Sequence, residues 1–183
     1  MTKAERTRAA LVGAALELFA ENGYDATTAA MIAERAGVTE MTFFRHFPSK
    51  DSVLIDDPYD PLIAEAVIHQ PPQLSAVAAA IGAIADGWQA IPPSASAEVR
   101  DRLRIVSRTP SLRGAIARNN ASTEAAIAGA LVARGTPQTD ARIAAAAVMA
   151  ALSAALLDWA EGDDPDLGTA IDTALRVLKG DAS

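Results

Sequence analysis

The sequence contains no cysteine, and only two of its 183 residues are histidines. Without cysteine the chain can form no disulfide, no thiolate metal site and no cysteine nucleophile. The histidines, His46 and His69, lack the His-x-x-x-His spacing of a metal site, and His69 has no obvious nucleophile beside it. The sequence also lacks a glycine-rich phosphate loop. We therefore expect neither an enzyme nor a protein that binds a metal or a cofactor.

Long hydrophobic runs are also missing. A membrane-spanning helix needs about 20 consecutive apolar residues. The longest candidate, from Ile143 to Ala160, is rich in alanine and contains Asp158, so we expect a buried helix of a soluble protein. The N-terminus mixes acidic with basic residues and shows no signal-type cleavage site. These features predict a cytoplasmic protein without membrane association.

Half of the residues are hydrophobic, which is enough for a sizeable core, but the formal net charge is -7. This charge argues against a protein that coats nucleic acid by bulk attraction. Residues 1–56 carry a net charge of -2 and residues 57–183 carry -5. Any contact with nucleic acid must therefore come from a local cluster of side chains.

Helical patterns dominate the chain, and no strand alternation interrupts them. An apolar stripe at helical spacing predicts a first helix that ends at Asn22-Gly23, a pair suited to a left-handed C-terminal cap. Thr28, Thr39 and Ser49 can each cap a short helix that follows. The N-terminal part is thus expected to hold several short helices behind one longer helix.

The composition changes at "DDPYDP", where two prolines fall within four residues. We place a domain boundary there, between an N-terminal domain of residues 1–56 and a larger helical domain of residues 57–183. The second domain is expected to begin with a helix after Asp60-Pro61. Its later helices are expected at roughly 74–91, 95–109, 110–134, 140–161 and 165–179. The predicted fold is all-α, with about nine helices.

The stretch "AERAGVTEMTFFRHFPSK", from Ala33 to Lys50, is unusual for a solvated or a buried helix. Short helices joined by "AGVT" indicate a helix-turn-helix, whose second helix enters the DNA major groove. Gly37 supplies the tight turn, because glycine takes positive φ without steric cost. Phe43 and Phe47 share one helix face and are expected to pack against the first helix.

The opposite face of this helix carries groups that suit the edges of DNA bases. Arg45 can pair bidentately with guanine, and Met41 or Phe44 can contact a thymine methyl group. Thr42 lies on the same face. A buried aromatic pair is what any short packed helix needs, so this outer face carries the DNA interpretation.

Other polar residues of the stretch suit the phosphate backbone. Thr39, His46 and Lys50 can each reach a phosphate. Glu40 has two interpretations, since it can accept a hydrogen bond from cytosine or can favour the helix N-terminus electrostatically. An exposed histidine or arginine is often simply solvated, and that alternative stays open.

The segment "TTAAMIAERAGVTEMTFFRHFPSKDSVL" closely resembles the DNA-binding segment of TetR-type (tetracycline-repressor-like) bacterial regulators, and the resemblance covers about residues 5–55. It implies a three-helix DNA-binding domain followed by a larger helical domain that binds an effector and dimerises. It also adds Thr28 to the DNA-contacting places. Many members have tyrosine where this chain has phenylalanine, so that side chain can contribute only apolar contact. The candidate DNA-contacting residues are Thr28, Thr39, Glu40, Met41, Thr42, Phe44, Arg45, His46 and Lys50.

The second domain gives weaker signals. In TetR-type proteins the last two helices pair with their mates in a dimer, and we expect the same of the segments 141–160 and 166–178; two core helices of a monomer are the alternative. An effector pocket is expected between the middle helices. The candidate lining residues, each of which is also a plausible core residue, are Trp88, Leu103, Val106 and Met149.

Arg100, Arg104 and Arg108 recur every four residues on one helix face. Such a face is usually solvated, although it can also hold an anionic head group. The segment that begins with "RLRIVSRTPSLRG" loosely resembles the C-terminal domain of a TetR subgroup associated with acyl-CoA-like ligands. The expected effector is therefore a small molecule, either hydrophobic or acyl-CoA-like.

Together these patterns predict a ligand-responsive, homodimeric regulator of transcription, and more specifically a repressor that a small-molecule inducer releases from a double-stranded DNA operator. Two other classes compete with this prediction. One is an enzyme on a helical scaffold, which the scarcity of general bases disfavours. The other is a helical interaction protein that does not bind DNA, which the negative charge of residues 1–56 favours.

Overall fold

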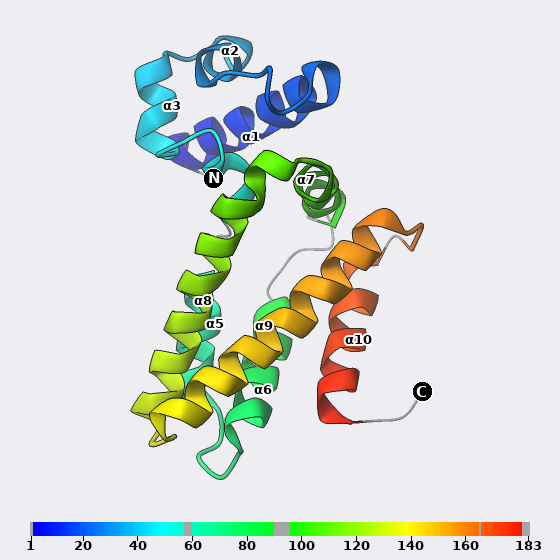
Figure 1. Cartoon of the computed structure of the whole chain (residues 1–183). Coiled ribbons are helices and arrows are strands. Elements are labelled where there is room, and N and C mark those ends of the chain that lie inside the picture. Colours follow the sequence, from blue (N-terminus) through cyan, green and yellow to red (C-terminus); the bar gives the residue numbers. More distant parts are fainter. Residues whose placement is uncertain (1, 57–59, 90–95, 165, 181–183) are drawn as a thin grey trace. The chain divides into compact units, whose positions relative to one another are not determined.

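The computed structural model describes residues 2–56, 60–89, 96–164 and 166–180. Within these ranges all regular structure is helical, with ten α-helices, one 3-10 turn and no strand (Figure 1). The all-α prediction is confirmed, and the described helices number ten rather than about nine.

The described residues form two compact units that are each interrupted in the sequence. The N-terminal unit comprises residues 1–56 and 101–116, and the second unit comprises residues 57–100 and 117–183. The predicted boundary coincides with the end of the first segment. A single cut there does not describe the packing, however, because Leu112 is buried in the core of the N-terminal unit and Ile105 and Val106 pack against that core.

The N-terminal unit begins with α1 (Lys3–Asn22), which carries a capping box. The Thr2 hydroxyl accepts from the Glu5 backbone N–H at 3.2 Å, and the Glu5 carboxylate accepts from the Thr2 N–H at 2.7 Å. These reciprocal bonds satisfy two of the donors that a helix start leaves unpaired. The predicted apolar stripe is confirmed, since the buried residues of α1 are Leu11, Val12, Ala14, Ala15, Leu18 and Phe19.

Three short helices follow, α2 (Ala29–Arg35), α3 (Glu40–His46) and α4 (Ser52–Ile55). The Thr28 and Thr39 hydroxyls accept from backbone N–H groups at the starts of α2 and α3, so both predicted caps are confirmed. The fourth helix differs from the prediction. Residues 50 and 51 form a turn instead, although the Ser49 hydroxyl does accept from the Ser52 N–H at 3.3 Å.

The end of α1 also differs from the prediction. Gly23 has φ of 80° but ψ of 158°, so it is not in the left-handed helical conformation. Its N–H still bonds to the Phe19 carbonyl at 3.0 Å, and the extended ψ then turns the chain away from the helix. The positive φ suits glycine because it has no Cβ.

The core of the N-terminal unit depends on a pair of phenylalanines from the stretch around α3. Phe43 and Phe47 are both fully buried, and their ring centroids lie 5.7 Å apart. They belong to the same core cluster as the buried residues of α1, as predicted from their spacing. Burial of each ring contributes about 1.5–3 kcal/mol relative to exposure, so this pair holds α3 onto the unit.

The second unit contains α5 (Asp60–His69), α6 (Ala76–Gln89), most of α8 (Arg113–Ala133), α9 (Gln138–Glu161) and α10 (Leu167–Lys179), together with the first residues of α7 (Ser96–Arg108). In this unit α9 packs against α6 and α10. Buried alanines are frequent on these three helices, and small side chains allow helices to approach closely; they include Ala79, Ala80, Ala83, Ala144, Ala145, Ala170 and Ala174.

Helix α9 is less buried than the sequence suggested. It is long and apolar enough, by length and composition, to cross a membrane, with a mean hydropathy of 1.8. Only 33% of that apolar window is buried, so the prediction of a buried helix is wrong for the single chain. Composition cannot show which apolar face of a helix its own chain covers.

The glycines at positions 13 and 37 provide a matched test of backbone strain. Gly37 has φ of 70°, whereas Gly13 lies inside the exposed part of α1, and a Cβ at either position meets no atom within 4 Å. We expect Gly37→Ala to destabilise the protein by about 1–2 kcal/mol because of the left-handed backbone. We expect Gly13→Ala to stabilise it by about 0.5–1 kcal/mol. Chemical denaturation measures both, and equal effects of the two changes would contradict the assignment of the turn.

Candidate nucleic-acid interface

Helices α2 and α3 and the turn between them form a helix-turn-helix within the N-terminal unit (Figure 1). Helix α2 ends at Arg35 with Ala36 as its C-cap, and the Gly37 N–H bonds to the Glu34 carbonyl at 3.0 Å. The Val38 N–H then bonds to the Ala33 carbonyl at 2.9 Å, which closes the turn. Since Val38 also packs against the core, the turn fixes α3 relative to α2.

The outer face of α3 exposes large apolar side chains. Met41 is 82% exposed and Phe44 is 49% exposed. The Phe44 ring meets the buried Phe43 ring edge-on, with 5.3 Å between the centroids, which fixes its direction. Exposed apolar groups that rest on a rigid base are typical of a contact surface rather than of a solvated helix.

Polar groups flank these apolar side chains on α3. Glu40 and Arg45 are exposed, and Thr42 and His46 are half-buried. The Thr39 and Thr42 hydroxyl oxygens lie 2.9 Å apart, so the cap of the helix and its outer face share a hydrogen bond. The structure thus brings every candidate between residues 39 and 46 onto one short helix and its cap.

The remaining candidates lie at the ends of the neighbouring segments. Thr28 is exposed and caps α2, and its hydroxyl accepts from the Met31 N–H at 3.2 Å. Lys50 is half-buried in the turn before α4. Phosphate oxygens favour backbone N–H groups and capping hydroxyls at helix starts, so the position of Thr28 suits phosphate contact.

Lys50 has an internal role that the sequence did not reveal. Its ammonium donates to the Tyr24 carbonyl at 2.7 Å and to the Thr27 carbonyl at 2.8 Å, and it lies 3.9 Å from the centroid of the Tyr24 ring. An ammonium has three N–H donors, so these bonds leave one for a phosphate. The loop between α1 and α2 is therefore tied to the turn before α4.

A second bond supports the same link, because the Tyr24 hydroxyl donates to the Asp51 carboxylate. Burial raises the pKa of Tyr24 above its ordinary value, and the hydrogen bond to Asp51 raises it further. Burial lowers the pKa of Lys50, and the carboxylates of Asp25 and Asp51 oppose that shift. These groups form a small charged network behind the helix-turn-helix.

Two other arginines of the N-terminal unit are held by their neighbours. Arg35 pairs with Glu17 at 3.1 Å and with Glu21 at 2.8 Å, and the Arg8 guanidinium lies 4.3 Å from the Phe47 ring centroid. The negative charges of Glu17 and Glu21 are thus partly neutralised by Arg35. The outward positive charge at α3 comes chiefly from Arg45.

The predicted effector-pocket residues do not gather in one unit. Leu103 and Val106 belong to the N-terminal unit, whereas Trp88 and Met149 belong to the second unit. Val106 packs against the N-terminal core. The assignment of these four residues to one effector pocket stays a prediction.

The arginine row of α7 is divided in the same way. Arg100 belongs to the second unit, where its guanidinium lies 4.2 Å from the Trp159 ring centroid and donates to the Asp164 carbonyl. Arg104 and Arg108 belong to the N-terminal unit. Among the described residues, the Arg100 Nε–H and the Trp159 indole N–H have no acceptor. The partners of Arg100 thus lie in the second unit, and a shared anion-binding role of the three arginines stays a prediction.

Comparison with known families matches both parts of the chain. Residues 11–56 match the family described as bacterial regulatory proteins, tetR family, and residues 72–182 match the family described as MftR C-terminal domain. The HTH-type transcriptional regulator TcmR of Streptomyces glaucescens is 33% identical over 141 residues, which cover 72% of this chain. The match spans 62% of the length of TcmR.

Solved structures show the same fold. NalD, the secondary repressor of the MexAB-OprM multidrug efflux pump in Pseudomonas aeruginosa, is 26% identical with a TM-score of 0.58, over 96% of both chains. SmeT, the repressor of the Stenotrophomonas maltophilia pump SmeDEF, is 21% identical with a TM-score of 0.61, over 94% of this chain and 88% of SmeT. FadR of Thermus thermophilus, solved with lauroyl-CoA, is 22% identical with a TM-score of 0.50, over 94% of this chain and 93% of FadR. These relatives are transcriptional regulators rather than enzymes.

The internal role of Lys50 is testable without DNA. We expect Lys50→Met to destabilise the protein by about 1–3 kcal/mol, because the Tyr24 and Thr27 carbonyls lose a charged donor. The matched change Lys3→Met, at an exposed position in the first turn of α1, should alter stability by less than about 0.5 kcal/mol. Thermal or denaturant unfolding of the two variants compares them directly. Equal stability of both would show that the Lys50 contacts contribute nothing.

Proposed function

The chain belongs to the TetR family of bacterial regulatory proteins, and we propose that it regulates transcription by binding a double-stranded DNA operator as a homodimer. The observation that carries this proposal is the outer face of α3. Met41 and Phe44 are exposed there beside Arg45, on a helix that the buried rings of Phe43 and Phe47 hold in place. A rigid helix with such a face suits the major groove.

Within this proposal, base reading and phosphate contact fall to different residues. Arg45 projects from the exposed face of α3, where its guanidinium can pair bidentately with guanine. Met41 and Phe44 supply apolar contact for thymine methyl groups, and Phe44 has no hydroxyl for a phosphate. Phosphate contact falls to Thr28 and to the remaining N–H of Lys50. The other candidates, Thr39, Glu40, Thr42 and His46, complete the surface at the start and the flank of α3.

Dimerisation is proposed through α9 and α10. The exposed side of α9 carries a stripe of apolar residues at helical spacing, with Ile143 63% exposed and Leu157 38% exposed at its two ends. Val177 of α10 is 60% exposed. A large exposed apolar stripe marks an interaction surface, and a helix-turn-helix protein needs two copies to read two half-sites. The exposed small residues of the stripe are Ala146, Ala147, Ala150 and Ala154.

We further propose that the protein is a repressor that a small molecule releases from its operator. Half-sites on one face of DNA are about 34–36 Å apart. A modest shift of the two helix-turn-helix motifs of a dimer therefore moves them out of register with the half-sites. The Arg102 guanidinium of α7 donates to the carbonyls of Leu54 at 2.9 Å and Asp56 at 2.8 Å, which ties α7 to the end of α4. Movement of α7 would therefore reach the helix-turn-helix.

The effector of that response is proposed to bind in the second unit, where Trp88 and Met149 lie. An acyl-CoA-like or otherwise hydrophobic molecule is the class that the sequence suggests. A ligand acts on operator binding only if it prefers one arrangement of the protein over another. Since TetR-family regulators are soluble DNA-binding proteins, we place the protein in the cytoplasm.

A second candidate function is a helical interaction protein that does not bind DNA. The net charge of -2 on residues 1–56 favours it, since phosphate contact normally needs positive charge. A mobility-shift assay with genomic fragments separates the two functions. A fragment that competitor DNA does not displace supports the regulator, and uniform weak binding or no binding supports the interaction protein.

On the operator, we expect Arg45→Ala to cost about 1–3 kcal/mol per half-site and to leave the affinity for random DNA nearly unchanged. Lys50→Met should weaken binding to both DNAs and lower the salt slope by about 0.9 per lost contact, or roughly 1.8 for a dimer. Arg118→Ala, at an exposed position on α8, serves as the control. The measurement is binding to operator and to scrambled DNA over a salt series, below the unfolding temperature of each variant. If Arg45→Ala weakens both DNAs equally and lowers the salt slope, Arg45 contacts phosphate instead of bases.

For the dimer, we expect Ala150→Arg to weaken self-association by about 2–5 kcal/mol, because it places an unpaired charge in the proposed interface. In a two-fold interface the same change occurs twice. Ala125→Arg places the same side chain on an exposed position of α8 and should leave the dimer intact. Sedimentation velocity of both variants distinguishes monomer from dimer, and an intact Ala150→Arg dimer would remove α9 from the interface.

A further inference from the structure

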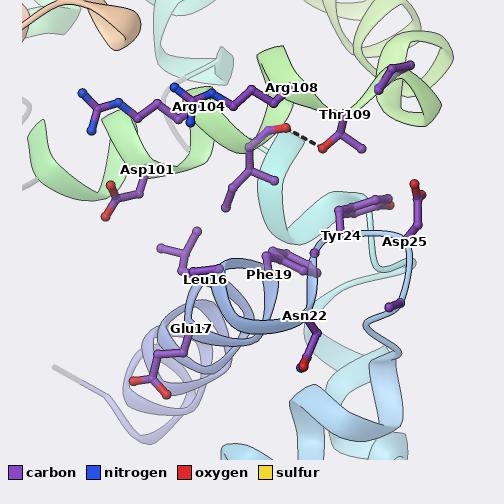
Figure 2. Close-up of a pocket in the computed structure, with 15 residues that line it drawn as sticks. Leu16, Glu17, Phe19, Asn22, Tyr24, Asp25, Asp101, Arg104, Arg108 and Thr109 are labelled. Carbon is purple, nitrogen blue, oxygen red and sulfur yellow. Dashed lines mark hydrogen bonds between the residues drawn. The ribbon is translucent and has the colours of Figure 1, made fainter.

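The Tyr24 residue contacts two neighbours of opposite charge, Lys50 and Asp51. Tyr24 lies in the loop after α1, beside Asp25 and close to Phe19 (Figure 2). It is only 8% exposed, and its hydroxyl donates to the Asp51 carboxylate in the turn before α4. Its ring and its backbone carbonyl hold the Lys50 ammonium. Tyr24 therefore contacts both the proposed phosphate donor and the acid next to that donor.

Two carboxylates lie close to the Lys50 ammonium and could take the place of a DNA phosphate there. Those of Asp25 and Asp51 are near enough to oppose the lowering of the Lys50 pKa by burial. Within the described ranges, however, neither is paired with this ammonium, whose hydrogen bonds go to the Tyr24 and Thr27 carbonyls. An ammonium has three N–H donors, so one N–H is left for a phosphate.

Each of these carboxylates is held by a hydroxyl from another part of the N-terminal unit. The Tyr24 hydroxyl donates to Asp51, and the Ser111 hydroxyl donates to Asp25 at 2.7 Å. A carboxylate that already accepts such a bond gains less by turning to a lysine. Asp25 and Ser111 are exposed, so water can replace the Ser111 hydroxyl, whereas Tyr24 is buried and Asp51 is half-buried. The Tyr24 bond is therefore the harder one to replace.

We propose that Tyr24 is a positioning residue for DNA contact, because its hydroxyl holds the Asp51 carboxylate away from Lys50 and so leaves one ammonium N–H for a phosphate; this rests on the proposed function. Without the hydroxyl, the carboxylate lacks its partner and turns to the adjacent ammonium. An ion pair between Lys50 and Asp51 then competes with the phosphate. The phosphate contact weakens even though Lys50 itself is unaltered.

Tyr24 also has a structural role, and a single change separates the two roles. The Tyr24 ring packs against Phe19 with 5.2 Å between the centroids, and it lies 3.9 Å from the Lys50 ammonium. Tyr24→Phe keeps the ring and the backbone carbonyl and removes only the hydroxyl. A loosened loop and a displaced acid would both weaken DNA binding, but only the second effect depends on the charge of Asp51.

We expect Tyr24→Phe to weaken binding to operator and to scrambled DNA alike, by about twofold to fivefold per half-site. The salt slope should fall by as much as about 0.9 per half-site, because a phosphate contact is lost. In the Asp51→Asn background, the same change should alter the affinity by less than about twofold, since an amide forms no ion pair with Lys50. Binding over a salt series is measured for the unaltered protein, both single variants and the double variant.

A control variant and a structure complete the test. Thr7→Ala removes another hydroxyl of the N-terminal unit, which donates to the Lys3 carbonyl at 3.0 Å rather than to an acid, and this variant should bind DNA normally. A crystal structure of the DNA-free Tyr24→Phe protein should show a carboxylate oxygen of Asp51 within about 4 Å of the Lys50 Nζ, the distance of an ion pair. An Asp51 side chain that stays apart from Lys50 would overturn the proposal.

Two binding results would also overturn the positioning role. One is a Tyr24→Phe protein that binds DNA as tightly as Thr7→Ala. The other is an equal weakening with and without the Asp51 carboxylate, which would show that Tyr24 acts only through the structure of the loop. Failure of the proposed function would appear instead in the unaltered protein, as absence of operator binding. It would remove the DNA part of the proposal, and the crystal structure would still decide whether Tyr24 holds Asp51 away from Lys50.

Discussion

The hydrogen bonds from the Lys50 ammonium to the Tyr24 and Thr27 carbonyls connect two parts of the N-terminal unit that are far apart in the sequence. They hold the loop after α1 against the turn before α4, and the helix-turn-helix lies between these two points in the sequence. The position of α2 and α3 therefore depends on one half-buried charge as well as on the phenylalanine core. The same ammonium is the proposed phosphate contact, so stability and the proposed DNA contact both depend on it.

Local signals in the sequence were sufficient for much of the N-terminal unit. The caps at Thr28 and Thr39 and the burial of Phe43 and Phe47 follow from side-chain chemistry and helical spacing within a few residues. The partners of Lys50 could not be predicted in this way. They are backbone carbonyls more than twenty residues earlier in the chain, and because every residue has a carbonyl, no sequence pattern marks them.

Long-range packing accounts for the other differences. Helix α7 was predicted with nearly the right ends, but its spacing could not show that Arg100 and Arg104 belong to different units. The apolar side of α9 was predicted to be buried, whereas much of it is exposed in the single chain. In the proposed dimer, this side of α9 is covered by the partner chain. In both cases the local structure was predictable from the sequence, and the partner of that structure was not.

The discontinuity of the N-terminal unit has a consequence for the order of folding. Residues 101–116 complete its core, and Leu112 among them is 1% exposed. During synthesis, the N-terminal segment that includes α1 to α4 leaves the ribosome well before Leu112 is available, and domains generally fold as units as the chain emerges. The core of the DNA-reading unit therefore closes only after the first helices of the second unit have been made. Folding of the N-terminal unit is therefore coupled to synthesis of the second unit, before any ligand or operator is bound.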